Sequence, residues 1–462
     1  MQELNLGYHY PIIYWNTACL IINAGANEEL DDNKSTQYGK IAKAIANFKQ
    51  RSIIVDRPLI NEAKFSFVPD EKNNRIIFSF KGLCGIGDDI ARAIVEHQPY
   101  SSFEDFCKRM VDTKIIGTAK MIILIKAGCF NELDSPDRME TMKKFLSRNV
   151  FTPIDKLTMQ QFNSALEYDI FPKEMETMIR IKNFKAYALH ESFFLKNIID
   201  EGKKVPKKGY HDRYFALDER GTEFLMEHFN TCIVGTKEDG VIISEKLFNK
   251  EWDALIQPLK DYMALPETLQ LYNQKKLDST MESYASGSLE QWDMESLSYY
   301  PDRHELWNLN EPKYGVVDYN SLPKIPEVYE HTTRRVRGEI KHFPKYKIFR
   351  LAGTVLDSDN NKHLVSLLTN HGVVTCKYNK GQYSYYNKRI SEQTPAGKKK
   401  VLEESWFKRG SKIIVCGYRR EDQFVIMKYP DTVYTHTTNR IEEIYNDGTI
   451  LAQTDRKKVG EG

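Results

Sequence analysis

The sequence lacks the features that would place the protein in a membrane, secreted or disulfide-rich class. No run of about 18 apolar residues occurs, so no transmembrane helix is predicted. The first apolar segment has no basic leader before it, which argues against a secretory signal. The seven cysteines are scattered, with no CxxC pair and no histidine cluster beside them. We therefore expect neither a zinc site nor a disulfide framework, and we interpret the cysteines as reduced core residues of a cytoplasmic protein.

Recognisable catalytic motifs are also missing. The sequence contains no P-loop, no nucleophile elbow and no HExxH. Two-metal nucleotidyl transfer needs clustered carboxylates. The candidates are the Asp357-x-Asp359 pair and the acidic run from Glu28 to Asp32, and we interpret both as solvated turns. Neither a catalytic residue nor a metal ligand is predicted on this chain.

The small net charge of +2 hides two stretches of opposite sign. Between Arg334 and Lys428 there are 21 Lys and Arg against 8 Asp and Glu, whereas Asp218 to Glu305 has 8 basic and 18 acidic residues. A basic region of this size is typical of a surface that binds a polyanion such as nucleic acid. A solvated, lysine-rich surface is the plainer alternative.

The hydrophobic pattern predicts an α+β multidomain protein. The N-terminal and middle regions read as mainly helical, with a β-hairpin expected over residues 65–80 and a capped helix starting at Ser102. We expect an exposed basic loop at 203–212. The expected regions are helices and a strand at 1–75, a helix-hairpin-helix region at 76–135, a mostly helical connecting region at 136–310, a linker at 311–333, an OB-fold domain at 334–430 and a tail at 431–462.

Strand-like alternation begins near Lys347. The five strand candidates lie at 348–359, 363–369, 372–378, 411–420 and 423–429. Five short strands with a longer connection between the third and fourth suit an OB-type barrel. An unrelated small β-barrel is the alternative.

The motif with the clearest chemistry is LCGIGDDIARAIV at 83–95. Two glycines around one apolar residue allow a tight turn whose backbone N–H groups face a phosphate, and the helix N-terminus that follows adds partial positive charge. An ordinary turn is the alternative, and Asp88 and Asp89 would repel a phosphate if they faced it. The predicted DNA-binding residues of this hairpin are Lys81, Gly82, Gly85, Ile86 and Gly87.

A second candidate DNA surface lies in the basic barrel region, where basic and aromatic residues interleave. OB surfaces bind single strands by stacking bases on aromatic rings, each worth about 1–3 kcal/mol. Strand alternation nevertheless predicts that some of these tyrosines lie in the core. The charged run Lys398 to Lys400 would add phosphate attraction. The candidates are Arg350, Lys377, Tyr378, Lys380, Tyr383, Tyr385, Tyr386, Lys388, Arg389 and Arg419.

Several segments, in order, resemble the region after the fingers of the bacterial replicative DNA polymerase III alpha subunit. The matching segments are HYPIIYWNTACLI, RSIIVDRPLINEAKFSFV, IIFSFKGLCGIGDDIARAIVEHQ, SSFEDFCKRM and LIKAGCFNELD, with a looser match at EQWDMESLSYYPDRHEL. In the last, the run from Asp302 to Glu305 replaces the family's usual Gly-His-Pro. Because the barrel region follows the hairpin region, the domain order resembles the DnaE type and not the PolC type. The resemblance covers 9–135 well and 290–428 fairly.

The resemblance implies a DNA-binding part of a polymerase in DNA replication. In that family the PHP domain and the palm, whose three acidic residues hold Mg²⁺, precede the fingers, so Mg²⁺ is expected on a palm outside this chain and no cofactor on it. The implied partners are duplex and single-stranded DNA, a palm-bearing chain of a split polymerase, and a sliding clamp. Gln270-Leu271-Tyr272 is a poor match to the short peptide that docks the clamp in this family. No membrane partner is expected. A fragment of a longer protein, or a non-catalytic accessory DNA-binding protein, are the alternatives.

Overall fold

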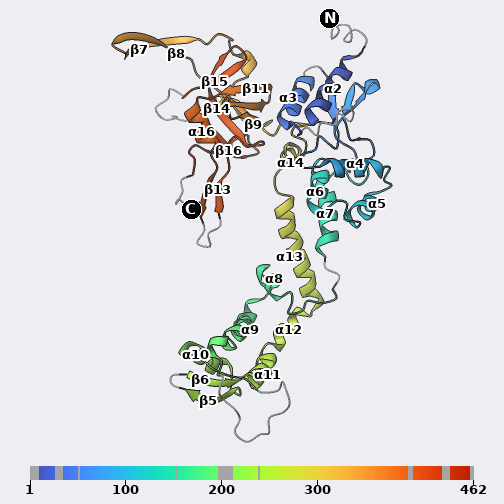
Figure 1. The fold of residues 1–462 in the computed structure, drawn as a ribbon, viewed down its shortest axis with the longest axis vertical. Helices are drawn as coiled ribbons and strands as arrows, with labels where there is room; N and C mark the ends of the chain where they lie inside the picture. The colour runs from blue at the N-terminus through green and yellow to red at the C-terminus, as the bar shows by residue number, and fades with distance from the viewer. Residues whose placement is uncertain are drawn as a thin grey trace. The chain divides into compact units, whose positions relative to one another are not determined.

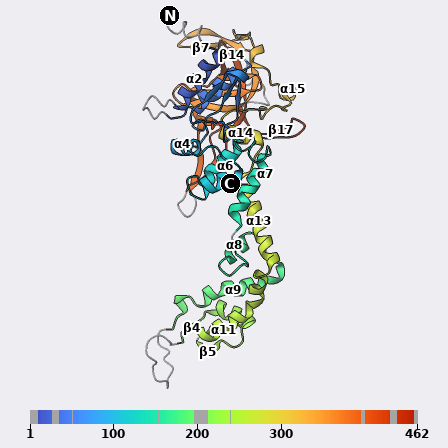
Figure 2. The same ribbon diagram turned by 90° about the vertical axis from the view of Figure 1, so that its right-hand side faces the viewer.

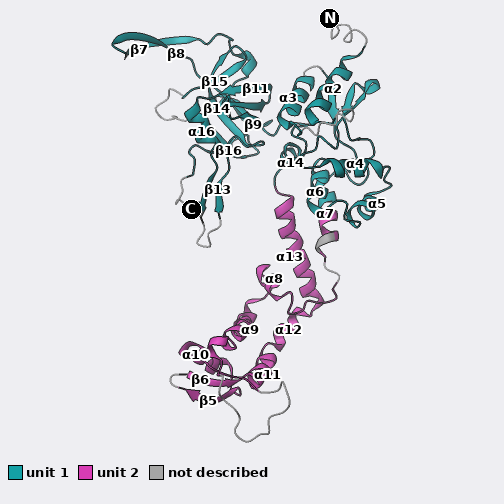
Figure 3. Ribbon diagram, in the orientation of Figure 1, with its two compact units in different colours: residues 1–142, 287–462 teal, residues 143–286 magenta. Residues whose placement is uncertain are grey.

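A computed structural model describes the chain over residues 10–26, 35–49, 52–151, 154–195, 212–237, 240–393, 399–428 and 437–457. It divides into two compact units (Figure 3). Unit 1 comprises residues 1–142 and 287–462, and unit 2 comprises residues 143–286. Within these described ranges, no helix combines the length and apolar character that a bilayer crossing requires. The acidic run from Glu28 to Asp32 lies outside the described residues, as does the expected basic loop except for its last residue.

The N-terminal part of unit 1 is helical around a small sheet. Strands β1, β2 and β3 form this sheet in the order β1-β3-β2, with β2 and β3 antiparallel where the hairpin was predicted. Ser102 caps the next helix, because its hydroxyl accepts a hydrogen bond from the Asp105 amide at 3.1 Å. The elements are α2 (Ile12–Ala24), α3 (Tyr38–Lys49), β1 (Ile54–Asp56), β2 (Val68–Asp70), η1 (Glu71–Asn73), β3 (Arg75–Ile77), α4 (Asp88–Glu96), α5 (Phe103–Phe106), η2 (Cys107–Val111) and α6 (Thr118–Lys126). Helix α7 (Arg138–Val150) begins in unit 1 and continues into unit 2.

The C-terminal part of unit 1 contains a closed five-stranded barrel (Figure 1). The pairing runs β9-β10-β11-β15-β14 and closes between β14 and β9, with β11 parallel to β15. This order, with a helix between the third and fourth strands, confirms the predicted α+β fold with an OB-type barrel. The core forms because inward residues of each strand are apolar, and Trp406 is fully buried within it. The elements are β9 (Phe349–Asp359), β10 (Leu364–Thr369), β11 (Gly372–Lys377), α16 (Lys380–Asn387), β14 (Lys412–Arg420) and β15 (Gln423–Ile426).

The segments expected as a linker and a tail are parts of this folded region. Tyr319 and Leu322 pack into the barrel core, so the expected linker at 311–333 is anchored to the barrel over its first half. In the expected tail, β16 extends the sheet from β14, and Arg456 forms a buried ion pair with Glu403 at 2.6 Å. Both segments were misjudged because their apolar residues, such as Val316 and Ile441, pack against barrel residues far away in the sequence. The elements are α15 (Glu311–Tyr314), η5 (Tyr319–Ser321), β16 (Thr438–Ile444) and β17 (Ile450–Gln453).

Two further antiparallel ribbons belong to unit 1. Strands β7 (Val328–Val336) and β8 (Glu339–Tyr346) form the longer ribbon directly before the barrel, across the boundary expected between linker and OB domain (Figure 1). Strands β12 (Ile390–Gln393) and β13 (Lys399–Glu403) form the second ribbon, in the long connection between β11 and β14. Helix α14 (Leu289–Ser296) also belongs to unit 1.

Unit 2 combines helices with a small sheet, where the sequence predicted a mostly helical region. The sheet has the order β4-β6-β5 and lies beside α11 (Figure 2). Its core includes Phe215, Phe229 and Phe248, all buried. The elements are α8 (Phe162–Glu167), η3 (Lys173–Met175), α9 (Glu176–Ala188), η4 (Glu191–Phe193), β4 (Tyr214–Ala216), α10 (Glu219–His228), β5 (Ile233–Lys237), β6 (Gly240–Ser244), α11 (Glu245–Leu255), α12 (Gln257–Met263) and α13 (Pro266–Tyr284).

Candidate nucleic-acid interface

The hairpin at Gly85-Ile86-Gly87 precedes α4 in unit 1. Gly85 and Gly87 are exposed, whereas Ile86 between them is buried and anchors the turn. Gly85 has a φ of +83°, the left-handed conformation that favours glycine. Within the described residues, the backbone N–H groups of Gly85 and Gly87 have no hydrogen-bond acceptor. The turn therefore presents free donors next to the N-terminus of a helix, an arrangement that suits a phosphate.

A second glycine turn, which the sequence reasoning missed, precedes α6. Gly117 has φ −82° and ψ 164°, almost the same conformation as Gly87, with φ −82° and ψ 166°. Its neighbour Ile116 is buried as Ile86 is. The signal was available in the sequence, because an Ile-Gly pair begins a helix in both places. The two turns are neighbours: Lys120 Nζ of α6 donates to the Gly85 carbonyl oxygen at 2.5 Å.

Two hairpin residues predicted to bind DNA have other roles in the structure. Lys81 forms an ion pair with Asp88, and its side chain is only 12% exposed. Its charge is therefore neutralised within the hairpin and does not extend toward solvent. Gly82 is buried, and a Cβ there would lie 2.9 Å from Phe78 Cε1, so this glycine is needed for close packing. The ion pair also reduces the expected repulsion between Asp88 and a phosphate, because Lys81 neutralises the Asp88 carboxylate.

Three tyrosines predicted to stack on DNA bases lie inside the barrel. Tyr378, Tyr383 and Tyr386 are each at most 5% exposed and pack around Phe407 and Trp406. A ring enclosed in the core cannot stack on a base, so their predicted role is wrong. Burial raises the pKa of all three hydroxyls above the usual value.

The prediction failed because the segment after β11 is a helix. Tyr383 and Tyr386 lie three residues apart on α16, so they share the helix face that covers the end of the barrel. Tyr385, about 100° away from Tyr386 around the helix, is 47% exposed.

The predicted basic residues of the barrel divide into exposed and engaged groups. Lys380 and Lys388 are exposed near α16, and Arg389 is exposed while paired with Glu404 at 3.0 Å. Lys399 and Lys400 are exposed on β13, and Lys398 lies outside the described residues.

The engaged residues hold neighbouring segments of the barrel in place. Arg419 lies over the Tyr319 ring and donates to the Tyr319 and Leu322 carbonyl oxygens, which attaches the preceding segment. Arg350 donates to the Tyr314 carbonyl oxygen at 3.1 Å, and Lys377 donates to the Lys362 carbonyl oxygen. These three side chains are thus engaged in hydrogen bonds within the fold.

One face of the barrel is covered by the N-terminal region of unit 1. Ala42 of α3 belongs to a buried cluster against which Leu368 of β10 and Val373 of β11 pack. The approach of α3 is close at Gly39, where a Cβ would lie 2.4 Å from Asp357 Cβ. The second and third strands are the usual oligonucleotide-binding surface of OB folds. In this protein part of that surface is used for packing.

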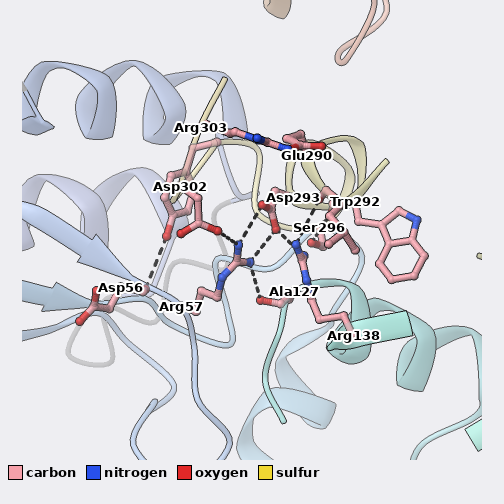
Figure 4. A network of polar contacts seen from close by, with 12 residues as sticks. Asp56, Arg57, Ala127, Arg138, Glu290, Trp292, Asp293, Ser296, Asp302 and Arg303 are labelled. Carbon is pink, nitrogen blue, oxygen red and sulfur yellow. Dashed lines mark hydrogen bonds and ion pairs between the residues drawn. The ribbon is translucent and has the colours of Figure 1, made fainter. Parts of the chain in front are cut away.

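A buried ion-pair network joins three distant segments of unit 1 (Figure 4). Asp293 of α14 accepts from Arg57 at 2.6 Å and from Arg138 at 2.5 Å, and its side chain is 4% exposed. Arg57 also pairs with Asp302 at 2.8 Å. Burial lowers the pKa of Arg57, but the bonds to Asp293 and Asp302 outweigh it, and its pKa ends above the usual value. The network holds α14 against the helix-hairpin-helix region.

The segment that departs from the resembled family is built into the same packing. His304 is neutral by geometry, because Nε2 lies 3.0 Å from the Leu368 carbonyl oxygen while Nδ1 accepts from the Leu306 amide. Burial lowers the pKa of His304 to about 4. Glu305 pairs with Lys412 of β14 at 2.5 Å. Asp302, His304 and Glu305 thus each hold this segment to a different neighbour.

The Asp357-x-Asp359 pair and the clamp-like tripeptide at 270–272 both have structural roles in the part of the chain that the structure describes. Asp359 accepts from the backbone amides of Asn361 and Lys362 at 2.9 Å, which closes the turn after β9. Across the described ranges, no group of three His, Cys, Asp or Glu residues is placed to hold a metal ion. Tyr272 of the poor clamp match is buried on α13 and packs against Tyr168, so that tripeptide cannot present its aromatic ring to a partner.

The comparisons with known proteins agree with the geometry. Residues 52–140, which contain both glycine turns, match the family model described as a helix-hairpin-helix motif. Two curated relatives match nearly the whole chain: the "Probable DNA polymerase YorL" of Bacillus subtilis (strain 168) and the "DNA-directed DNA polymerase" of Bacillus phage SPbeta. Each is 40% identical over 467 residues, which is 99% of this chain and 34% of the relative. The chain therefore contains a helix-hairpin-helix motif, is similar to DNA polymerases, and spans about a third of the length of these relatives.

Proposed function

We propose that this chain is a DNA-binding portion of a replicative DNA polymerase of the polymerase III alpha type, with the DnaE order of domains. The observation that carries the proposal is the 40% identity to two DNA polymerases over 99% of the chain. The helix-hairpin-helix turns and the OB-type barrel supply the parts that such a role requires. Nucleotidyl transfer would take place on a palm outside these 462 residues, carried by a separate chain that also holds the Mg²⁺ ions.

The hairpin region would grip the duplex behind the polymerase centre. The free backbone N–H groups at Gly85 and Gly87, and the matching turn at Gly117, suit the phosphate oxygens of a DNA strand. Such contacts position the duplex without reading bases, so binding should be independent of sequence and should weaken as salt rises.

The barrel would hold the single-stranded template. Support for this role comes from the exposed basic residues Lys380, Lys388 and Arg389 and from the exposed ring of Tyr385. A positive groove with exposed aromatic rings is the usual chemistry of single-strand binding.

The test is reconstitution of primer extension. The purified chain is combined with the product of any neighbouring reading frame that encodes a palm, on a primed template with Mg²⁺, and extension by each chain alone is compared with extension by the mixture. We expect extension only when both are present. The control is a palm chain whose metal-binding acids are replaced by alanine.

A chain that binds DNA and never raises extension with its neighbouring palm would overturn the polymerase proposal and favour the accessory DNA-binding protein. A chain that binds neither duplex nor single-stranded DNA would overturn both.

A further inference from the structure

The β7–β8 ribbon is a regular hairpin with a tight turn. Its register pairs Arg334 with Lys341 and Arg335 with Ile340. Arg337 and Gly338 form the two-residue turn, with φ of +53° and +89°. Two consecutive positive φ angles match the type I′ turn, whose twist suits antiparallel strands. The ribbon is thus a regular hairpin whose tip is the Arg337–Gly338 turn.

Both faces of this ribbon lie open. Among the described side chains from 328 to 346, all are exposed except Thr332 and Tyr346. The exposed side chains include Ile340 at 69% and Phe343 at 41%. A two-stranded ribbon with neither face covered is marginally stable by itself in water, so a partner that covers its faces would stabilise it.

The charges of the ribbon are positive on both faces and at its tip. Residues 328–346 contain five Lys and Arg against two Glu, a net charge of +3. Opposed residues share a face and successive pairs alternate, so Arg334 and Lys341 lie on one face and Arg335 lies on the other. Lys345 is paired with Glu330 at 2.5 Å, whereas Arg334 and Arg337 have no ion pair within the described part of the chain.

We propose that the β7–β8 ribbon enters a groove of duplex DNA, with its arginines reaching the phosphates on both sides. This inference rests on the proposed function, because it assumes that the chain binds DNA. The major groove is about 12 Å wide and admits a two-stranded ribbon. Eight residues of strand extend about 26 Å, long enough to cross it.

The distribution of charge favours a duplex over a single strand. In a groove, both faces of the ribbon meet a phosphate backbone, and Arg334 and Arg335 point to opposite sides. A ribbon lying on one strand would need charge on one face only. Ile340 shares a face with Arg335 and Phe343 shares a face with Arg334, so each of these exposed side chains would contact the sugars of the backbone that its own face meets.

The test replaces the tip charges and keeps the fold. The variant Arg334→Gln, Arg335→Gln, Arg337→Gln is compared in the full chain with a control of equal charge change in unit 2. The control is Lys173→Gln, Lys250→Gln, Lys275→Gln, because these three lysines are also exposed. Fluorescence anisotropy measures the Kd for a 30-base-pair duplex and for a single strand of the same length over a range of salt. Thermal unfolding verifies that both variants fold.

We expect the tip variant to bind the duplex at least about tenfold more weakly. The slope of log K against log salt should become shallower by about 0.9 for each phosphate that the variant no longer neutralises. Single-strand affinity and the control variant should change less than about threefold. As a second measurement, a photo-crosslinking residue at position 340 should capture the duplex and not the single strand.

The outcomes separate this inference from the proposed function. If the unmodified chain binds the duplex and the tip variant binds it equally well, the ribbon proposal is wrong and the DNA-binding function stands. Equal losses on duplex and single strand, or an equal loss in the control, would also overturn insertion into a groove. If the unmodified chain binds no DNA, the proposed function itself fails.

Discussion

At the scale of single residues, the hairpin glycines differ in what a side chain would meet. A Cβ at Gly85 would lie 3.2 Å from Ile123 Cδ1, and its positive φ would strain any other residue. At Gly87 and Gly117 a Cβ would meet nothing within 4 Å, and both have an ordinary extended conformation. These two positions can therefore be changed without disturbing the packing, which makes them the sharper test of phosphate binding.

We predict that Gly87→Val with Gly117→Val weakens duplex binding by at least about tenfold, because the branched side chains would keep a phosphate from reaching the backbone N–H groups, and hydrogen bonds to a charged group contribute about 1.5–3 kcal/mol each. The unfolding free energy should change by less than about 1 kcal/mol per site. The matched control is Gly235→Val on β5, where a Cβ makes only ordinary contact at 3.7 Å. Unchanged duplex affinity in a folded double variant would contradict the role of both turns.

His304 should make stability depend on pH. Its pKa in the folded protein is lowered to about 4 by burial, from 6.5 when unfolded. Above pH 6.5 the His304 imidazole is neutral in both the folded and the unfolded state, so its contribution to the unfolding free energy is fully present. As the pH falls from 6.5 to 4, the imidazole is protonated in the unfolded chain but stays neutral in the folded protein, so the unfolding free energy falls by up to about 3 kcal/mol. Urea titrations from pH 7.5 to 4 measure this, and His304→Gln should show a smaller loss over the same window; an equal loss in both would contradict it.

At the scale of elements, α16 shows how one helix separates a structural face from an exposed one. Tyr386 stacks with Trp406 at 5.2 Å between ring centroids, whereas the neighbouring Tyr385 is 47% exposed. The helix places the two side chains about 100° apart. Which of two adjacent tyrosines is buried and which is exposed is therefore decided by how α16 packs on the barrel.

We predict that Tyr386→Ala lowers the unfolding free energy by about 3–5 kcal/mol, because it leaves a cavity in the barrel core. Tyr385→Ala should cost less than about 1 kcal/mol and should instead weaken single-strand binding, since Tyr385 is 47% exposed although its ring also makes an edge contact with Tyr386. Chemical denaturation and anisotropy on the two variants measure both effects. Similar losses of stability in the two variants would contradict the assignment of the faces.

At the scale of the whole molecule, unit 1 is assembled from segments far apart in the chain. Asp293 links Arg57 and Arg138, so residues on either side of the 143–286 unit meet in one network. Removing one partner of a buried ion pair leaves uncompensated buried charge, which costs more than the pair itself contributes.

We predict that Asp293→Ala lowers the unfolding free energy of unit 1 by about 3–5 kcal/mol. Asp302→Ala should cost less than about 1 kcal/mol, because Asp302 is 77% exposed and its pair with Arg57 is screened by solvent. Denaturant titration followed by tryptophan fluorescence compares the two, since Trp292 lies beside Asp293 in α14. An Asp293 variant as stable as the Asp302 variant would contradict the role of the network.

Much of the fold could be predicted because the signals are local. Alternating apolar residues predicted all the barrel strands within a few residues, and the Gly-Ile-Gly spacing predicted a turn with exposed glycines and a buried isoleucine. The expected linker and tail could not be assigned correctly, since their contacts with the barrel involve partners about 30 to 100 residues away, such as Tyr319 with Phe424.

The sequence by itself determined the hairpin, the barrel strands and the concentration of positive charge between 334 and 428, because backbone preference, strand alternation and formal charge are properties of short segments. Only the tertiary structure decided which charged and aromatic residues remain available for DNA. Lys81 is neutralised by Asp88, Tyr378 is enclosed in the core, and Arg334 is exposed on a ribbon. Burial and ion pairing depend on neighbours brought together by folding, and these neighbours set whether a side chain can reach a phosphate or a base.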